Sequence, residues 1–295
     1  MKAYYRGIIS LVFVMIVWGS SFTVTKVVVE TLSPIYFAFL RFLVASLVML
    51  VVFLTKRRPP VVWKLLPHRY LIGMALSGAS LFYIFFNYSL KYTAASTGAL
   101  LEGFMPAIIA ILSAIFLKEK LGRWQVIGII VSFTGILMLG LVKNTSANAP
   151  DPLLGNILMI GAVFSWAVYT VLSKKVAYIE PVTTTFYVTV LGTLFLLPLV
   201  FFEMRGQAWP MPTKDAWMAI IYLGAVASAL CYIMYNTALE KLTASQVGNF
   251  LNLDPVTGAI IAIIFLHEKV VVSQLAGCLL VFTGVWLSTK NPPGR

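Results

Sequence analysis

Three ionisable side chains, Arg41, Glu102 and Asp254, stand inside apolar runs that are long enough to cross a membrane. A charged side chain facing lipid costs about 3 kcal/mol or more, so each of the three marks a candidate site by default. Counted at about 1.5 Å per helical residue, Arg41 and Glu102 lie roughly 12 Å from one face of a hydrocarbon core about 30 Å thick. Asp254 lies roughly 17 Å from the opposite face, which puts all three at a similar level. At that common level Arg41 could neutralise one carboxylate, or the three groups could hold a zwitterion between them.

A polar cluster surrounds the last of these residues and consists of Asn249, Asn252, Asp254 and Pro255. A proline removes one helical hydrogen bond, and a freed carbonyl at membrane depth is tolerated only against protein or a wet cavity. The cluster therefore predicts that Asn252, Asp254 and Pro255 line a water-accessible cavity. The alternative is that the two asparagines form polar bridges to neighbouring helices.

The elements that must position these residues are transmembrane helices. Of the 295 residues, 60% are hydrophobic and 11% are charged, whereas a soluble protein carries about 25% charged residues. The net charge of +12 is typical of cytoplasmic loops that face anionic lipid, so we expect no nucleic-acid partner. Both cysteines, Cys231 and Cys278, lie in apolar runs, and we expect no metal and no cofactor.

A helix needs about 20 apolar residues to cross the hydrocarbon core, and ten runs of the chain meet that measure. Fifteen Lys and Arg residues lie on the side of both termini and six on the other, while Arg41 lies within a run. Both termini are therefore predicted to be cytoplasmic, in a multi-pass protein of a bacterial inner membrane. The predicted spans cover about residues 8–29, 33–54, 69–90, 94–117, 122–142, 152–172, 182–203, 215–238, 243–266 and 271–289.

The chain also repeats itself, because residues 103–135 match residues 252–284 at a constant offset of 149 residues. Each half, 1–145 and 150–290, then holds five spans, and because five is odd the second half enters the membrane inverted. We therefore predict an all-α polytopic membrane protein, with ten transmembrane helices as two inverted five-helix repeats around a central cavity. In transporters of this architecture the site lies near the membrane midplane at interrupted helices. Pro106 and Pro255 share a repeat position and are the predicted helix breaks.

Several longer motifs carry a family resemblance. They are "VWGSSF" (17–22), "LSPIYFAFLRF" (32–42), "NYSLKYTAASTGALL" (87–101), "LKEKLGRWQVIGIIVSFTGILML" (117–139), "YNTALEKLTASQVG" (235–248) and "FLHEKVVVSQLAGCLLVFTGVWL" (265–287). Together they resemble the drug/metabolite transporter superfamily, EamA type, over nearly the whole chain. The resemblance implies a ten-helix fold of inverted repeats and the export of small metabolites. Within that superfamily the chain is similar to bacterial amino-acid exporters of the YddG kind.

Further side chains are candidates for substrate contact. Asn87 and Asn236 share a repeat position and either line the pathway or cap the next helix. Aromatic residues of the spans could stack on a flat substrate, although packing or lipid contact is the alternative for most of them. The predicted substrate-binding residues are Trp18, Ser21, Asn87, Glu102, Trp166, Tyr169, Asn236, Asn249, Asn252 and Asp254.

These features favour a secondary transporter that exports small metabolites, most of all amino acids, aromatic ones included, by alternating access. An alternative is proton-coupled efflux of cationic drugs, which two intramembrane carboxylates would suit and which Arg41 argues against. A membrane-embedded enzyme or a receptor is a third reading. The sequence has no H-E-x-x-H, Walker A or G-x-S-x-G motif, so we expect no enzyme. We expect a monomer in the lipid bilayer that binds a small-molecule substrate.

Overall fold

The computed structural model describes residues 2–55, 66–93, 98, 101–140, 150–206, 209–254, 256–257 and 272–288. Within these ranges the chain forms helices, turns and loops, and no strand is present. The all-α prediction is therefore confirmed for the described part of the chain. Pro255 lies outside the described residues, so the predicted break at that position has no structural description.

Six helices of the described chain are long and apolar enough to cross a membrane, and they coincide with six of the predicted spans. Residues on their outer faces, such as Leu54, Ile157 and Phe202, are apolar and exposed, which suits contact with lipid. The six are α1 (Lys2–Val29), α2 (Pro34–Leu54), α3–η2–α4 (His68–Met74, Ala75–Leu81, Phe82–Tyr92), α8 (Pro152–Lys175), α9 (Pro181–Glu203) and α10–η3–α11 (Lys214–Ile221, Tyr222–Leu230, Cys231–Lys241).

Shorter helices fill the regions of the other predicted spans: α6 (Met105–Phe116), α7 (Arg123–Gly140), α12 (Ala244–Phe250) and α14 (Val272–Ser288). Residues 103–104 form a turn, after which α6 begins with Pro106 in its first turn. A proline fits there because the first helical N–H groups have no partner within the helix. In a similar way α12 ends at Phe250, and residues 251–252 form a turn.

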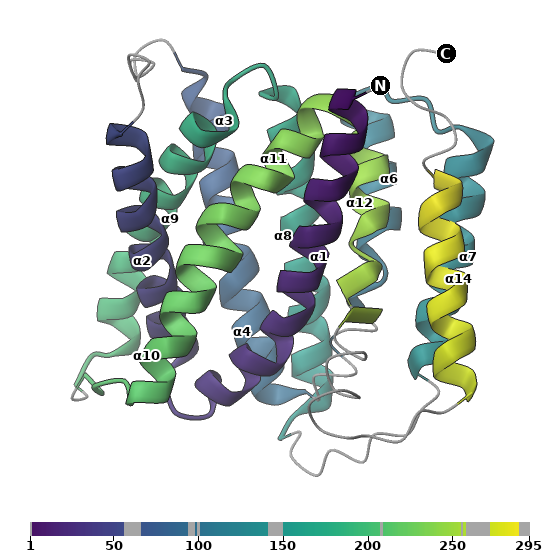
Figure 1. The fold of residues 1–295 in the computed structure, drawn as a ribbon. Coiled ribbons are helices and arrows are strands. Elements are labelled where there is room, and N and C mark those ends of the chain that lie inside the picture. Colours follow the sequence, from purple (N-terminus) through teal and green to yellow (C-terminus); the bar gives the residue numbers. More distant parts are fainter. Residues whose placement is uncertain are drawn as a thin grey trace.

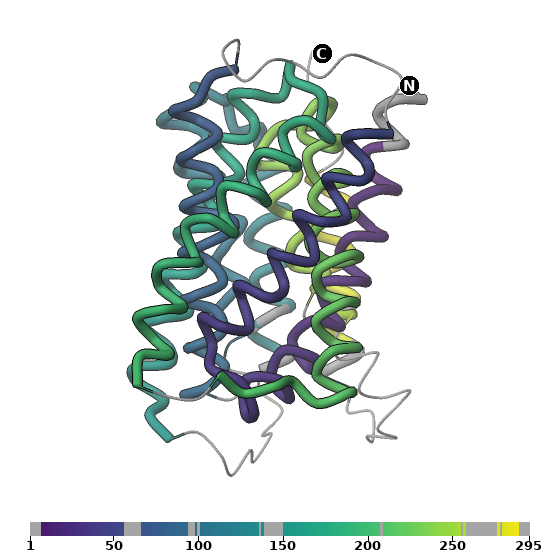
Figure 2. The backbone as a smooth tube through the Cα atoms, turned by 90° about the vertical axis from the view of Figure 1, so that its left-hand side faces the viewer, coloured from purple at the N-terminus to yellow at the C-terminus, as the bar shows by residue number. Residues whose placement is uncertain are grey.

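Successive spans run in alternate directions, and α1 begins at the end of the bundle where α14 finishes (Figure 1). Seen from the side, the helices extend from one end of the bundle to the other, and some are inclined to their neighbours (Figure 2). Basic residues gather at the end where α1 begins. There the Lys175 ammonium lies 5.8 Å from the Tyr70 ring and 6.0 Å from the Phe116 ring.

Two π-helical segments interrupt the third and the eighth predicted spans at matching positions. Shifted by the offset of 149 residues, Ala75–Leu81 falls on 224–230, within the second segment, Tyr222–Leu230. The wider π turn leaves carbonyl groups free, and one from each segment accepts a hydrogen bond from an aromatic side chain. The Tyr232 hydroxyl donates to the Gly78 carbonyl at 2.7 Å, and Trp18 Nε1 donates to the Ala227 carbonyl at 2.8 Å.

Two lysines hold the ends of the same two spans. Lys26 Nζ donates to the Leu90 carbonyl at 2.6 Å, at the end of α4. Lys174 Nζ donates to the carbonyls of Leu239 and Leu242, at 2.6 and 2.7 Å, at the end of α11. A positive charge suits the C-terminal carbonyls of a helix. In each half of the chain, a lysine ammonium thus binds the carbonyls at the end of the corresponding helix, α4 or α11.

The helices α7 and α14 form a pair at one edge of the bundle (Figure 1). A methyl group added at Gly128 would lie 2.5 Å from the Gly284 carbonyl oxygen, and one at Gly135 would lie 2.6 Å from the Gly277 oxygen. The lower residue number on one helix meets the higher number on the other, so the helices are antiparallel. Glycine permits this close approach, which is common between membrane helices.

Candidate functional site

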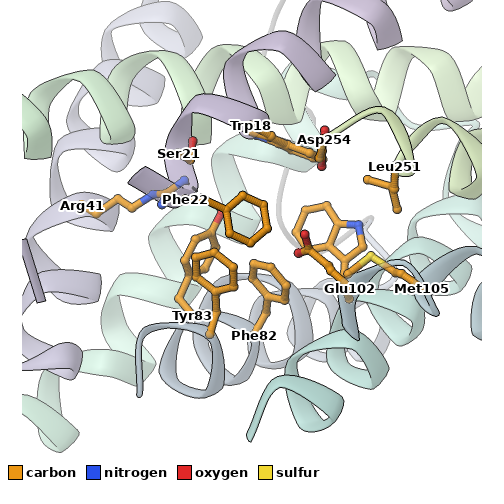
Figure 3. Close-up of a pocket in the computed structure, with 12 residues that line it drawn as sticks. Trp18, Ser21, Phe22, Arg41, Phe82, Tyr83, Glu102, Met105, Leu251 and Asp254 are labelled. Carbon is orange, nitrogen blue, oxygen red and sulfur yellow. Dashed lines mark hydrogen bonds between the residues drawn. The ribbon is translucent and has the colours of Figure 1, made fainter. Parts of the chain in front are cut away.

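A partly open cavity lies within the bundle, where α1, α2, α4 and α8 meet the turns before α6 and after α12. Six of its twelve lining residues are aromatic, and the side chains of Arg41, Glu102 and Asp254 also face it (Figure 3). Its lining consists of Trp18, Ser21, Phe22, Arg41, Phe82, Tyr83, Phe86, Glu102, Met105, Trp166, Leu251 and Asp254.

The aromatic wall is held by ring contacts between helices. Trp18 on α1 and Trp166 on α8 meet edge to face, with ring centroids 5.0 Å apart. Phe82 joins them, its centroid 5.0 Å from that of Trp166, while Phe22 meets Phe86 at 5.2 Å. Because the Trp18 indole N–H is engaged on Ala227, the Trp18 ring has a fixed orientation. Such a wall suits a flat or aromatic ligand.

Arg41 on α2 reaches the cavity and is 1% exposed. Its Nε donates to Ser228 Oγ at 2.8 Å, a terminal nitrogen donates to the Tyr83 hydroxyl at 3.1 Å, and the guanidinium carbon lies 4.3 Å from the centroid of the Tyr83 ring. Among the residues described by the structure, no ion pair joins Arg41 to Glu102 or Asp254. The expected direct neutralisation of a carboxylate by Arg41 is therefore absent, and its charge remains available to a ligand.

The two carboxylates, Glu102 and Asp254, are 9% and 4% exposed and line the same cavity. Glu102 directly precedes the 103–104 turn, and Asp254 follows the 251–252 turn, so each lies at a helix interruption. Asp254 Oδ1 has no hydrogen-bond partner among the described residues. Both carboxyl groups face this one cavity (Figure 3). In Figure 3 they lie to one side of the Phe22 and Phe82 rings and Arg41 lies to the other.

The main chain at Asp254 is held against α1. Thr257 Oγ1 donates to the Asp254 carbonyl at 2.9 Å and lies 3.0 Å from the Met15 carbonyl oxygen. Gly19 faces the same point, since a methyl group there would collide with the Thr257 side chain and lie 2.7 Å from the Asp254 oxygen. The glycine of the "VWGSSF" motif therefore permits the contact that places Asp254 at the cavity.

Five of the residues predicted to bind substrate line this cavity. They are Trp18, Ser21, Glu102, Trp166 and Asp254. Tyr169 packs on Trp166 with ring centroids 4.8 Å apart, but its hydroxyl donates to Asn236 outside the cavity lining.

The predicted asparagines lie elsewhere in the bundle. Asn87 donates to the Pro34 carbonyl at 3.0 Å, and Asn236 donates to Thr185 Oγ1 at 3.2 Å, so each contacts the first turns of a neighbouring helix. Asn249 donates to the Gly284 carbonyl at 3.2 Å. Asn252 Nδ2 donates to Asn249 Oδ1 at 3.4 Å. The Asn249 bond to α14 matches the alternative of a polar bridge between helices, whereas the Asn252 bond stays within its own segment. A role of the four asparagines in substrate binding stays a prediction.

Three further lining residues, Phe82, Tyr83 and Phe86, belong to the aromatic residues that the sequence offered for stacking on a flat substrate. Sequence reasoning did not select Phe22, Met105 and Leu251. The internal repeat could have indicated two of these lining residues, Met105 and Leu251. Glu102 corresponds to Leu251 and Met105 to Asp254 at the offset of 149 residues, and all four line the cavity. Each half thus contributes two corresponding positions, with one carboxylate at a different position in each half.

Comparison with known proteins adds a family and its relatives. The sequence profile of the EamA-like transporter family matches residues 5–141 and again residues 153–290. The uncharacterized transporter YetK of Bacillus subtilis is 29% identical over 283 residues, covering 95% of this chain and 86% of YetK. An uncharacterized transporter of Archaeoglobus fulgidus is 31% identical over 285 residues, covering 95% of this chain and 96% of that protein.

More distant similarities reach plants and a solved structure. A WAT1-related protein of Arabidopsis thaliana is 24% identical over 242 residues, covering 72% of this chain and 66% of that protein. A crystal structure matches with a TM-score of 0.75 and 18% identity, covering 98% of this chain and 96% of the other. At that identity the match shows the fold alone.

Proposed function

This chain belongs to the EamA-like transporter family, and from that premise we propose that it is a secondary transporter that exports small metabolites by alternating access. Amino acids, aromatic ones included, are the proposed substrates. The relatives named above are transporters without an assigned substrate, so the proposal rests on this chain's own cavity and on the resemblance of its motifs to amino-acid exporters.

One observation carries the substrate class, namely the combination of groups that face the cavity. An aromatic wall is flanked by carboxylates on one side and by the Arg41 guanidinium on the other (Figure 3). An aromatic amino acid presents a ring, an ammonium and a carboxylate, which are complementary to these three features. A substrate without a cationic group would offer no ammonium to Glu102 and Asp254.

Alternating access is supported by the relation between the two halves. We propose ten spans, in the halves 1–145 and 150–290, with the second half inverted and the two carboxylates near the membrane midplane. Three observations support this arrangement: the family profile matches twice, the π segments correspond, and α7 packs antiparallel on α14. We further propose a monomer in the cytoplasmic membrane of a bacterium, with its basic end and both termini in the cytoplasm.

Counterflow tests this function. Purified protein in liposomes loaded with unlabelled phenylalanine should accumulate external labelled phenylalanine, because an exchanger converts the outward gradient into uptake. Protein-free liposomes supply the baseline. A panel of aromatic, aliphatic and basic amino acids ranks the substrates, and uptake equal to the baseline for every member would refute amino-acid transport.

A second candidate is the efflux of organic cations, which the carboxylates favour. Arg41 forms no ion pair with Glu102 or Asp254 among the described residues, so two acidic groups are free to receive an ammonium. A quaternary ammonium with an aromatic ring tests this candidate in the same counterflow assay. Uptake of the cation without uptake of any amino acid would favour this function over the first.

A further inference from the structure

The cavity contains one fixed positive charge and two acidic groups. An arginine stays protonated in proteins, so Arg41 contributes its charge at every relevant pH. Glu102 and Asp254 together would contribute two negative charges if both were ionised. Of the other buried titratable groups in the described part of the bundle, the Tyr83, Tyr169, Tyr232 and Tyr235 hydroxyls and the Cys231 thiol are of types that are ordinarily neutral near pH 7.

Burial makes an unbalanced charge in this cavity costly. Arg41 is 1% exposed and Asp254 4% exposed, and an uncompensated buried charge costs several kcal/mol. With both carboxylates ionised, the three groups would carry a net negative charge. One proton on the carboxyl pair makes the empty cavity neutral, because Arg41 and both carboxyl groups line the same space.

We propose that Glu102 and Asp254 form a proton-exchange pair whose coupling depends on the charge of the substrate. This inference rests on the proposed transport function. A zwitterion adds no net charge, so its ammonium pairs with the ionised carboxylate, its carboxylate faces Arg41, and the proton stays. An organic cation adds one positive charge, so the remaining acid releases its proton to water as the cation binds.

The release step is balanced in atoms and charge. The O–H bond of the protonated carboxyl group breaks, its electron pair stays on the carboxylate oxygen, and the proton passes to water on the open side of the membrane. The cation takes the place of the proton as counter-charge. Amino acids would thus cross without protons, whereas a monovalent cation would exchange for about one proton, because both ends of that cycle are neutral.

Two compounds, only one of which has a carboxylate, distinguish transport without protons from exchange for a proton. Phenylalanine and (2-phenylethyl)trimethylammonium share an aromatic ring and a cationic nitrogen, and the quaternary nitrogen cannot carry a proton itself. Purified protein is reconstituted in liposomes that enclose a pH-sensitive dye, and uptake of each labelled compound is measured together with internal pH. We expect phenylalanine uptake without a pH change and cation uptake with internal alkalinisation of about one proton per cation.

Substitutions of Glu102 and Asp254 test whether these two side chains carry the exchanged proton. Glu102→Gln and Asp254→Asn each leave one carboxylate opposite Arg41, so the empty cavity is neutral without a bound proton. In each variant the proton-to-cation ratio should fall at least fivefold, or cation uptake should stop while phenylalanine uptake is still measurable. Glu240→Gln is the matched control, because Glu240 lies outside the cavity and pairs with exposed Lys241 at 3.5 Å. It should keep the wild-type ratio.

The outcomes are separable. Uptake of neither compound above protein-free liposomes refutes the proposed function itself. Uptake accompanied by equal proton movement for both compounds, or cation uptake without proton movement, overturns the exchange pair while transport stands. A wild-type ratio in both carboxyl variants would also overturn it.

Discussion

At the scale of the residue, Arg41 commits two of its guanidinium nitrogens to Ser228 and Tyr83. Among the described residues its other terminal nitrogen makes no hydrogen bond. A substrate carboxylate can therefore meet a guanidinium that is already held in place. Preorganised charge of this kind binds more tightly than a mobile side chain, because less freedom is lost on binding.

Arg41→Met should lower phenylalanine uptake at low substrate concentration at least tenfold, because a charge-assisted hydrogen bond contributes about 1.5 to 3 kcal/mol. Uptake of the trimethylammonium compound should fall less, since it has no carboxylate. Ser228→Ala, which removes one support of the guanidinium, should have a smaller effect. Equal losses for the two compounds, measured as initial uptake rates, would show that Arg41 only supports the fold.

Gly19 gives a second prediction at this scale. Gly19→Ala should destabilise the protein by about 1 to 3 kcal/mol, because the added methyl group collides with Thr257 and crowds the Asp254 main chain. It should also lower uptake of both compounds, since Asp254 would shift. Gly7→Ala on the same helix is the control, because its methyl group would meet atoms only at 3.7 Å or beyond. Thermal unfolding in detergent compares the two variants, and equal melting temperatures would contradict the contact.

The sequence predicted the types of residue that line the cavity, but it predicted the particular residues less well. Glu102 and Asp254 were predictable because a carboxylate within an apolar run is energetically costly and therefore marks a candidate site. Asn87 and Asn249 look equally polar in the sequence, yet their amides donate to the carbonyls of Pro34 and Gly284. The direction of a side chain depends on helix rotation and on the next helix, and a single sequence contains neither.

At the scale of the element, six predicted spans became membrane-length helices of the described chain. Their boundaries were predictable because proline and small polar residues punctuate long apolar runs, as at Pro34, Pro152 and Pro181. The π segments were not predictable. They arise where one extra residue is accommodated in a turn, and Ala75–Leu81 contains no residue type that requires it.

The lysine contacts at the helix ends carry the third prediction. Lys174→Met should lower the free energy of unfolding by about 1 to 3 kcal/mol, since it leaves the Leu239 and Leu242 carbonyls at the end of α11 without their charged donor. Lys26→Met should have a smaller effect, because the second carbonyl of that pair lies 3.5 Å from Nζ. Lys241→Met is the control, as its ion pair with Glu240 is exposed and contributes about 0 to 1 kcal/mol. The free energy of unfolding is measured by denaturant or thermal unfolding. A loss in Lys241→Met as large as that in Lys174→Met would contradict this role of Lys174.

At the scale of the whole molecule, the two halves contribute corresponding parts to one cavity. Trp18 and Trp166 meet edge to face, and positions 102 and 105 lie with 251 and 254 around the same space. A cavity built between two halves can open to either side when one half tilts against the other. In the proposed cycle, access to the carboxylates from the two sides of the membrane would change in this way.

Ser21 offers a way to observe that change, because its side chain lines the cavity and the Ser-to-Cys substitution is small. In a protein whose two cysteines are replaced by alanine, Ser21→Cys should react with a membrane-impermeant thiol reagent from both sides of the membrane, at rates that added phenylalanine changes. Cysteines at Lys120 and Arg205, both exposed, are the controls and should react only from the cytoplasm and only from outside, respectively. A cysteine at 21 that reacts from one side only, with or without substrate, would mean that the cavity does not alternate. One that reacts from neither side would place the substrate path elsewhere in the bundle.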